Sequence, residues 1–349
     1  MRVVVVGATG NVGTSAVRAL AADPGVTSIL GLARRRPALE IDKTEWAEAD
    51  VHGTDLVPHF RGADAVVHLA WLFQPTHSPL ITWRVNVLGS ARVFLAVAEA
   101  GVPALVYASS VGAYSPGPKD RRVDEMWPTH GWAAAAYSRE KSYVERLLDV
   151  FEAEHPRCRV VRFRPGFIFK REAASEQRRL FAGPFVPGTL VRPGLIPFVP
   201  DIPGLRFQAL HADDAGEAYR LAVTREVRGP FNLAAEPVIG TSELAALLEA
   251  RTVPVPARGV RAALRAAWRL GLVPASPDLL DLALHIPVMD TTRARTDLGW
   301  SPARTAMDAM SEFLAGLRAG AGMDTPPLAP GTGGPMRLRE LVTGVGRRP

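Results

Sequence analysis

Tyr137 and Lys141 are the two side chains whose types and spacing point most directly to chemistry. They lie four residues apart at the start of a predicted helix, in Tyr137-Ser138-Arg139-Glu140-Lys141. Residues at this spacing share one helix face, with Cβ atoms about 5–6 Å apart. A free phenol has a pKa of about 10, and a nearby ammonium stabilises the phenolate and lowers that pKa. The pair therefore predicts proton transfer to or from a substrate oxygen.

Two serines supply hydroxyl groups next to a predicted strand. Ser109 and Ser110 directly follow the apolar stretch 104–108. Ligands of open α/β sheets bind at the carboxyl ends of the strands. A serine hydroxyl there can hydrogen-bond the reacting oxygen while the phenol transfers its proton. Val111 and Tyr114, just beyond the serines, are predicted to face the substrate.

A glycine loop follows the first predicted strand. Gly7-Ala8-Thr9-Gly10-Asn11-Val12-Gly13 lies between the valine run 3–6 and a helical stretch at 11–22. Glycines there permit a tight turn and close backbone approach, and the helix N-terminus attracts a pyrophosphate. The predicted cofactor contacts in this loop are Gly7, Thr9, Gly10, Asn11, Val12 and Gly13.

The end of the second strand predicts the choice of cofactor. Sites for NAD usually place a carboxylate there to bind the ribose hydroxyls, whereas an arginine suits the 2′-phosphate of NADP. This chain lacks the acid and has Arg34, Arg35 and Arg36 instead. We therefore expect NADP(H) to be favoured over NAD(H), with Arg34 as the first contact and Arg35 as the second. The alternative is a solvated basic turn without a ligand.

The elements that must position these residues alternate between strand and helix. Apolar strand-like runs at 3–6, 27–32, 65–69, 104–108 and 159–163 are separated by helical stretches, notably 82–100 and 134–154. Such alternation predicts an α/β fold with a doubly wound parallel sheet of the Rossmann type.

The remainder of the chain predicts a smaller C-terminal substrate-binding lobe. Residues 1–169 form the predicted dinucleotide-binding domain, with contributions from about 207–235. Residues 170–206, rich in Pro, Gly and Arg, and 236–319 form the lobe. From about residue 320 to 349, Gly and Pro dominate, which predicts a mobile tail.

Composition excludes several classes of function. The net charge is +6, but the arginines are scattered along the chain, which argues against nucleic-acid binding. The single Cys158 fits a reducing compartment, and the chain begins without a signal-like segment, so we expect a cytoplasmic protein without a membrane partner. The eight histidines show no metal-ligand spacing, so no metal site is predicted. One predicted helical face carries four arginines, Arg258, Arg261, Arg265 and Arg269. This face could contact an anionic membrane or, more simply, solvent.

Taken together, these motifs resemble the extended branch of the short-chain dehydrogenase/reductase superfamily, of the NAD-dependent epimerase/dehydratase type. The resemblance runs from residue 2 to about residue 302. It implies that Ser110, four residues before Tyr114, is the catalytic hydroxyl, and that Lys141 binds the nicotinamide ribose. It also implies a homodimer formed through the helices 82–100 and 134–154. Further cofactor contacts implied by the resemblance are Asp50, Val51, Leu69, Ala70, Asn86, Pro165, Gly166 and Phe167.

Departures from the family pattern narrow the expected substrate. Dehydratases carry an Asp-Glu pair where this chain has Val111-Gly112, so dehydration is not expected. Nucleotide-sugar enzymes usually have Asn and Gly where this chain has Phe167 and Lys170.

Bulky apolar residues follow the predicted strand at 65–69. Trp71 and Phe73 lie at the ligand edge of the predicted sheet. They favour a pocket for an apolar carbonyl compound, or simple packing under the loop 74–80. The leading hypothesis is an NADP(H)-dependent oxidoreductase acting on a small molecule. The alternatives are a nucleotide-sugar epimerase that retains NAD and a non-catalytic regulator that senses NADP(H).

Overall fold

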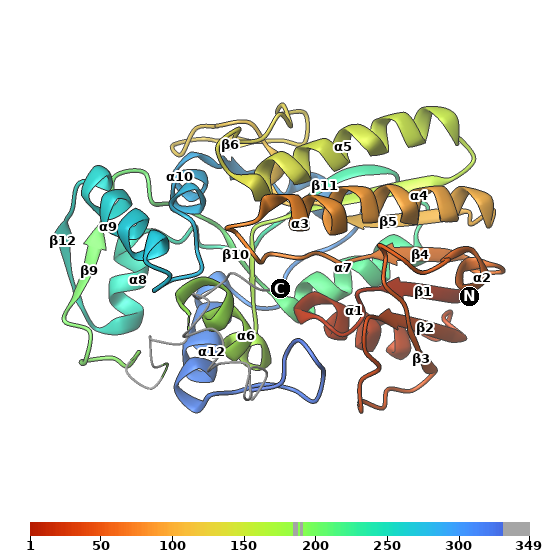
Figure 1. Cartoon of the computed structure of the whole chain (residues 1–349), viewed down its shortest axis with the longest axis horizontal. Helices are drawn as coiled ribbons and strands as arrows, with labels where there is room; N and C mark the ends of the chain where they lie inside the picture. The colour runs from red at the N-terminus through yellow and green to blue at the C-terminus, as the bar shows by residue number, and fades with distance from the viewer. Residues whose placement is uncertain (184–187, 189–190, 331–349) are drawn as a thin grey trace.

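A seven-stranded parallel sheet forms the centre of the molecule, in a computed structural model that describes residues 1–183, 188 and 191–330 (Figure 1). The strand order is β3-β2-β1-β4-β5-β7-β11. The predicted doubly wound α/β fold of the Rossmann type is therefore confirmed. The strands are β1 (Arg2–Val6), β2 (Ser28–Ala33), β3 (Thr44–Glu48), β4 (Ala65–His68), β5 (Ala104–Ala108), β7 (Arg159–Pro165) and β11 (Gly229–Leu233).

Helices cover both faces of this sheet, because its strands carry apolar side chains on both sides. In β1, Val3 and Val5 belong to one hydrophobic core, and Val4 and Val6 belong to the other. Alternate residues of a strand point to opposite faces, so the unbroken valine run suits a strand buried on both sides. The covering helices are α1 (Asn11–Ala22) and α7 (Ala212–Thr224) on one face, and α2 (Val57–Phe60), α4 (Gly89–Glu99) and α5 (Ala136–Glu154) on the other.

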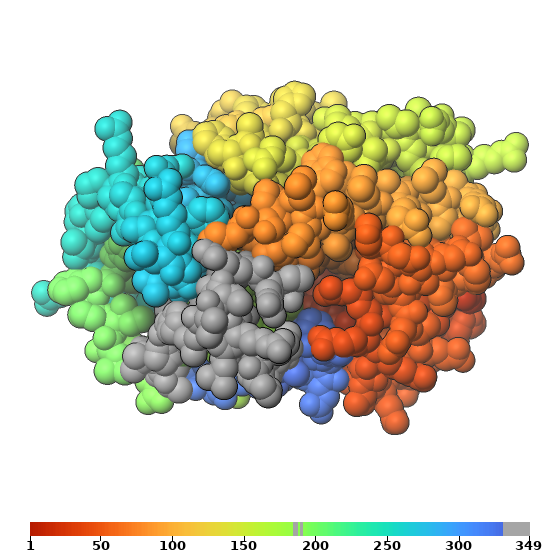
Figure 2. Space-filling view, viewed as in Figure 1, coloured from red at the N-terminus to blue at the C-terminus, as the bar shows by residue number. Residues whose placement is uncertain are grey.

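The C-terminal lobe packs beside the sheet domain, as the cyan and green surface next to the orange and yellow surface in Figure 2 shows. It is built from short strands in pairs and from helices of moderate length. Its strands are β8 (Phe167–Phe169), β9 (Phe198–Asp201), β10 (Ala209–His211) and β12 (Arg251–Pro254). Its helices are α6 (Ala174–Gln177), the π-turn Arg178–Ala182, α8 (Thr241–Leu248), α9 (Ala257–Arg269), α10 (Pro277–His285) and α12 (Ala306–Ala319).

Smaller elements join the two parts. A 3₁₀ turn at Val111–Ala113 follows β5, and another at Arg171–Ala173 follows β8. The short strands β6 (Arg122–Val123) and β13 (Val288–Met289) pair in parallel, and α11 (Thr292–Thr296) packs near β11.

One continuous helical run passes the length and composition test for a membrane span. It covers Pro79–Glu99 and comprises α3 (Pro79–Trp83), a π-helical segment (Arg84–Leu88) and α4. Half of it is buried inside the fold, where Val93 and Val97 belong to the core beneath the sheet. Its apolar character is therefore that of a helix packed on a sheet.

The described part of the tail differs from the sequence prediction. A mobile tail was expected from about residue 320, but residues 321–330 fold back onto the glycine loop. Thr325 and Leu328 are almost completely buried. The Thr325 hydroxyl donates to the carbonyl of Thr9 at 2.9 Å. Burial of these two side chains favours the folded-back position of this Gly- and Pro-rich stretch. Residues 331–349 of the predicted tail lie outside the described residues.

Candidate active site

Tyr137, Lys141 and Ser110, the three predicted catalytic residues, lie together at the carboxyl end of β5. Tyr137 and Lys141 are in the first two turns of α5. The Lys141 ammonium donates to the carbonyl of Ala108 at 2.7 Å. The Ser110 hydroxyl contacts the Tyr137 phenol and also accepts from the Gly112 N–H at 2.9 Å. Helix periodicity thus sets Tyr137 above Lys141, and the end of β5 brings the serine to them.

Burial sets the protonation of this group. It raises the pKa of Tyr137 to about 12, against the hydrogen bond from Ser110, which lowers it. Burial also lowers the pKa of the Lys141 ammonium well below its usual range, while Glu145 and Glu140 oppose that shift. A low-dielectric setting favours the neutral phenol, whereas Glu145 and Glu140 support the charged form of Lys141. The site therefore presents a protonated phenol, which is the form that donates a proton.

Gly112 is essential to the fit of the Tyr137 ring. A Cβ at this position would lie 2.8 Å from Cε1 of Tyr137 and 3.3 Å from Oγ of Ser110. The backbone of the 3₁₀ turn therefore packs directly on the phenol. A larger side chain here, such as the Glu of the dehydratase pattern, would displace either Tyr137 or Ser110.

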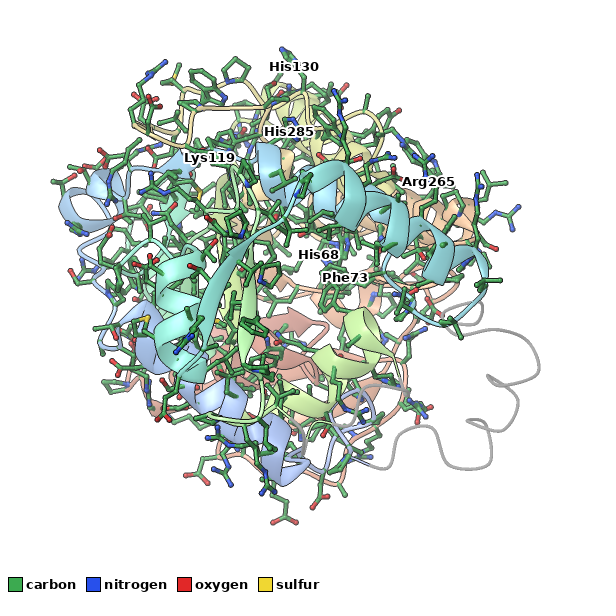
Figure 3. All side chains as sticks on the ribbon, turned by 90° about the vertical axis from the view of Figure 1, so that its left-hand side faces the viewer. His68, Phe73, Lys119, His130, Arg265 and His285 are labelled. Atoms are coloured by element: carbon green, nitrogen blue, oxygen red, sulfur yellow. The ribbon has the colours of Figure 1, made fainter. Side chains whose placement is uncertain are left out.

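Aromatic rings enclose the other sides of the phenol. Phe73 stacks on Tyr137, with ring centroids 5.1 Å apart and an interplanar angle of 11°. Trp71 meets the same ring edge-on at 5.8 Å, and Phe181 meets Phe73 edge-on at 5.7 Å. Figure 3 shows Phe73 in the interior of the molecule. Trp71 and Phe73 therefore pack directly on the Tyr137 ring, and their predicted contact with a substrate stays a prediction.

Asn86 holds this aromatic segment in place, and its predicted role as a cofactor contact stays a prediction. Its carboxamide accepts from the N–H of Leu72 at 2.7 Å and donates to the Leu72 carbonyl at 2.8 Å. It also donates to Glu140 at 2.6 Å, and Asn86 is fully buried. All its polar atoms are therefore engaged within the protein. Asn86 positions the backbone between Trp71 and Phe73, and Glu140 orients Asn86.

Glu140 could not have been identified from the sequence. It directly precedes Lys141, in a helix that carries several other charged residues, so no local signal distinguishes it. In the structure it is buried and accepts from Asn86 and from Thr82, the latter at 2.6 Å. Burial raises the pKa of the Glu140 carboxyl, and these two hydrogen bonds oppose the shift.

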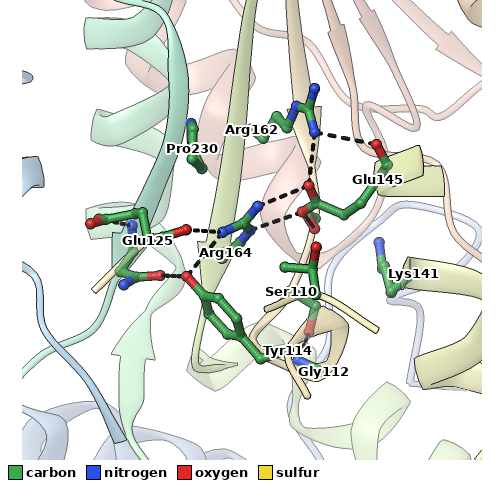
Figure 4. Close-up of polar contacts among 12 residues, drawn as sticks. Ser110, Gly112, Tyr114, Glu125, Lys141, Glu145, Arg162, Arg164 and Pro230 are labelled. Atoms are coloured by element: carbon green, nitrogen blue, oxygen red, sulfur yellow. Dashed lines mark hydrogen bonds and ion pairs between the residues drawn. The ribbon is translucent and has the colours of Figure 1, made fainter. Parts of the chain in front are cut away.

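A buried ion-pair network beneath the site holds the segment after β5 (Figure 4). Arg164 donates to both carboxylate oxygens of Glu145, at 2.9 and 3.0 Å. Ser109 donates to the same carboxylate at 2.5 Å. Tyr114, predicted to face the substrate, is instead 1% exposed, and its hydroxyl contacts Arg164 and Asn232. Tyr114 is thus part of this support, because its ring turns inward from the 3₁₀ turn, whereas Val111 lies in the hydrophobic cluster that includes Tyr137.

The glycine loop has the shape that a dinucleotide requires. Gly7 has φ +85°, and a Cβ there would lie 2.6 Å from the backbone N of Ala70. A Cβ on Gly13 would lie 2.3 Å from the Gly7 carbonyl, whereas Gly10 meets nothing closer than 3.7 Å. Gly7 and Gly13 are thus needed for packing between strand, loop and helix, and Gly10 leaves one side of the loop open.

The start of α1 adds two features that fit the same ligand. Among the described residues, no side chain caps its N-terminus at Gly10, and its first turn contains no acid. The first N–H groups of a helix lack intrahelical partners and favour an anion. Oδ1 of Asn11 is buried without a donor among the described residues, and a ribose hydroxyl is a suitable one. The residues present therefore fit a dinucleotide, with its pyrophosphate at this helix end.

The other predicted cofactor residues lie along the same edge of the sheet. Gly7 and Ala8 donate to the carbonyl of Leu32, which places Arg34 and Arg35 beside the glycine loop with both side chains exposed. Asp50 caps the turn after β3 through the N–H of His52, and Val51 packs under Gly89. Leu69 and Ala70 follow β4, and Pro165, Gly166 and Phe167 follow or end β7. In the described part of the chain, no group of metal-binding side chains occurs.

A family model described as the NAD dependent epimerase/dehydratase family matches residues 3–182. That span includes the glycine loop, Ser110, Tyr137 and Lys141. The chain belongs to this family. The family description agrees with the Rossmann-type fold and with a nicotinamide dinucleotide as the expected class of cofactor.

Three proteins illustrate its place among family members. An uncharacterised protein of Mycobacterium tuberculosis is 27% identical over 93% of this chain, and this chain spans only about a third (31%) of that relative's length. A 4-hydroxy-2-methyl-3-oxo-4-farnesyl-3,4-dihydroquinoline-1-oxide ketoreductase of Stigmatella aurantiaca is 26% identical, over 92% of this chain and 98% of its own length. The structure of the Thermus thermophilus UDP-glucose 4-epimerase in complex with NAD superposes with a TM-score of 0.67 at 21% identity, covering 91% of this chain and 99% of that one. The last similarity shows a shared fold.

Proposed function

We propose that this family member is an NADP(H)-dependent oxidoreductase that interconverts a carbonyl group and an alcohol on an apolar small molecule. The observation that carries the proposal is the contact of the Tyr137 phenol with Ser110 and Gly112, one helical turn from Lys141 and under the rings of Trp71 and Phe73. It combines a proton donor, a hydroxyl for the reacting oxygen and an apolar enclosure.

The residues supply the proton and the hydrogen bonds of the reaction. When bound, a nicotinamide would supply the hydride for reduction of the carbonyl carbon, or accept it from the alcohol carbon. Tyr137 gives its phenolic proton to the substrate oxygen during reduction and takes a proton back during oxidation. Ser110 hydrogen-bonds that oxygen, and the charged form of Lys141 stabilises the phenolate that remains. Each reduction thus adds one hydride and one proton to the carbonyl group.

The aromatic enclosure supports an apolar substrate. Trp71 and Phe73 pack on Tyr137 and Phe181 packs on Phe73. Aromatic side chains of this kind favour apolar and aromatic ligands. The tight packing at Gly112 argues against a dehydratase, which needs acid and base groups there. The ketoreductase relative acts, by its name, on a farnesylated quinoline oxide, which agrees with a largely apolar substrate.

A cofactor titration is the primary test. We expect purified protein to bind NADPH at least tenfold more tightly than NADH and to reduce apolar ketones with net consumption of NADPH. Retention of NAD through purification, without net consumption, would instead support the epimerase alternative. Binding of NADPH without turnover of any ketone would support the regulator.

A matched pair of tyrosine variants tests the mechanism. Tyr137→Phe removes the phenolic proton, and we expect turnover to fall about 10²–10⁴-fold with cofactor affinity retained. Tyr143→Phe, on the exposed side of the same helix, serves as the control and should retain wild-type turnover. Near-wild-type turnover of Tyr137→Phe would refute the assigned role.

The homodimer implied by the family resemblance is also a proposal. The π-helical segment before α4 exposes Leu88, and helices α4 and α5 expose Leu95, Tyr143 and Val150, so a partner copy would cover apolar surface. Light scattering should give twice the monomer mass, and Leu95→Glu should shift that mass towards the monomer.

A further inference from the structure

Lys170 is a buried lysine that none of the steps above uses. It follows β8, and its side chain crosses to α1, where its exposed fraction is only 2%. Its ammonium donates to the Asn11 carbonyl at 2.6 Å, to the Thr14 hydroxyl at 2.6 Å and to the Ser15 hydroxyl at 3.3 Å. All three acceptors lie in the first turns of the helix whose N-terminus faces the glycine loop.

The three acceptors that bind this ammonium are neutral, and the carboxylates of Glu172, Asp213 and Glu176 act on it only at longer range. One hydrogen-bonded route to a carboxylate runs through Ser15, which donates to Asp213 at 2.7 Å. The Asp213 carboxylate is itself about half exposed and lies 3.5 Å from the guanidinium of Arg304. A buried cation without an ion-pair partner is costly, and such groups are normally paired or lose their proton. Accordingly, burial lowers the pKa of Lys170 to about 8.

An anion at the N-terminus of α1 would supply the missing partner. The N–H groups of Asn11 and Val12, which no side chain caps, lie in the first turn of α1. The carbonyl of Asn11 in that same turn accepts from the Lys170 ammonium. A full charge one turn behind a helix N-terminus adds to the partial charge of the helix dipole. The first turn of α1 therefore connects Lys170 to the position where a pyrophosphate fits.

We propose that Lys170 is the internal counter-charge for the pyrophosphate of the bound dinucleotide, acting from behind the first turn of α1. This inference rests on the proposed dinucleotide function. It makes Lys170 a positioning residue, because Nζ contacts the helix and the helix contacts the ligand. It also gives a use to a residue that replaces the Gly expected from nucleotide-sugar enzymes.

A charge-removing variant with a matched control provides the first test. We expect Lys170→Met to weaken binding of NADPH and of ADP-ribose at least tenfold, and to leave adenosine binding within twofold. Lys119→Met is the control, because burial also lowers the pKa of Lys119 to about 8 and its ammonium also binds neutral acceptors, the carbonyls of Arg206 and Ala283. Lys119 lies against the lobe near His285 (Figure 3), and its variant should bind all three ligands as wild type does.

The charge itself is tested by a conservative variant and by proton uptake. Lys170→Arg should bind NADPH within about threefold of wild type. In wild-type protein, an anion favours the protonated lysine, so NADPH binding should take up protons near pH 8, and affinity should fall as the pH rises through 8. Calorimetry in buffers of different ionisation enthalpy measures this uptake without a variant at Lys170, so it remains informative if Lys170→Met fails to fold.

The effect of the other charged groups that face Lys170 on proton uptake must be distinguished from that of Lys170 itself. They are Glu172 on the 3₁₀ turn, Asp213 on α7, Arg18 on α1 and Glu176 on α6. Burial raises the pKa of Glu176 to about 7, so it too takes up protons, and the uptake near pH 8 should persist in Glu176→Gln. Absence of dinucleotide binding by wild type would refute the proposed function. Wild-type binding with an unchanged Lys170→Met affinity and no uptake near pH 8 would refute this inference alone.

Discussion

The indole of Trp71 covers the Lys141 ammonium, with Nζ 3.4 Å from the ring centroid. A desolvated cation–π contact of this kind contributes about 2 kcal/mol. The proposed function needs the same ammonium for the nicotinamide ribose, so the indole and the ribose compete for one charge.

Trp71→Ala should therefore increase cofactor affinity. We expect NADPH to bind about three- to tenfold more tightly, because the ribose no longer displaces the indole. A fluorescence titration measures the change. Trp83→Ala is the control, since Trp83 packs against the exposed Tyr143 and should leave the affinity unchanged. Weaker NADPH binding by Trp71→Ala would mean that the indole supports the cofactor.

Removal of Phe73 should impair substrate binding more than cofactor binding. An aromatic stack is worth about 0.5–1.5 kcal/mol beyond its buried area, and the substrate loses one wall of its enclosure. We expect Phe73→Ala to raise KM for an apolar ketone about tenfold, with NADPH affinity within threefold of wild type. Phe313→Ala, which removes a ring packed on Phe169, is the control. An unchanged KM would show that Phe73 only packs under its loop.

Arg34 should determine the choice between the two cofactors. Its guanidinium is exposed beside the glycine loop, where it can pair with a 2′-phosphate. Arg34→Ala should weaken NADPH binding at least tenfold and leave NADH binding within twofold. Arg36→Ala, in the same basic turn, should have a smaller effect. Equal losses for both cofactors would indicate a nonspecific effect of charge.

Glu145 should make the stability of the protein depend on acid. Although burial opposes it, hydrogen bonding and charge from Arg164 lower the pKa of Glu145 to about 2, below its value in the unfolded chain. Its contribution, on the order of 3 kcal/mol, is fully present above about pH 4.5 and is lost as the pH falls towards 2.

Denaturant unfolding at several pH values tests this dependence. The free energy of unfolding of wild type should fall between pH 5 and pH 2, and Glu145→Gln should flatten that fall while lowering stability at pH 7. Glu226→Gln is the control, because Glu226 lies on the surface, with 96% of its side chain exposed. A wild-type slope retained in Glu145→Gln would assign the acid sensitivity to other carboxyls.

The sequence by itself determined the features that depend on local spacing. The four-residue separation of Tyr137 and Lys141 places both on one face of α5 in any α-helix, and the glycines from Gly7 to Gly13 are compatible with few other turns. The alternation of apolar runs and helical stretches likewise requires a parallel sheet, which the structure confirms.

Only the tertiary structure decided which side chains meet across long stretches of chain. Asn86 reaches Glu140, Lys170 reaches Asn11, and Thr325 reaches Thr9 over separations of 54, 159 and 316 residues. No periodicity records such contacts, because they depend on how strands, helices and loops pack once the chain has closed on itself. For that reason local spacing predicted the candidate reacting groups, whereas packing determined which side chains hold, charge and cover them.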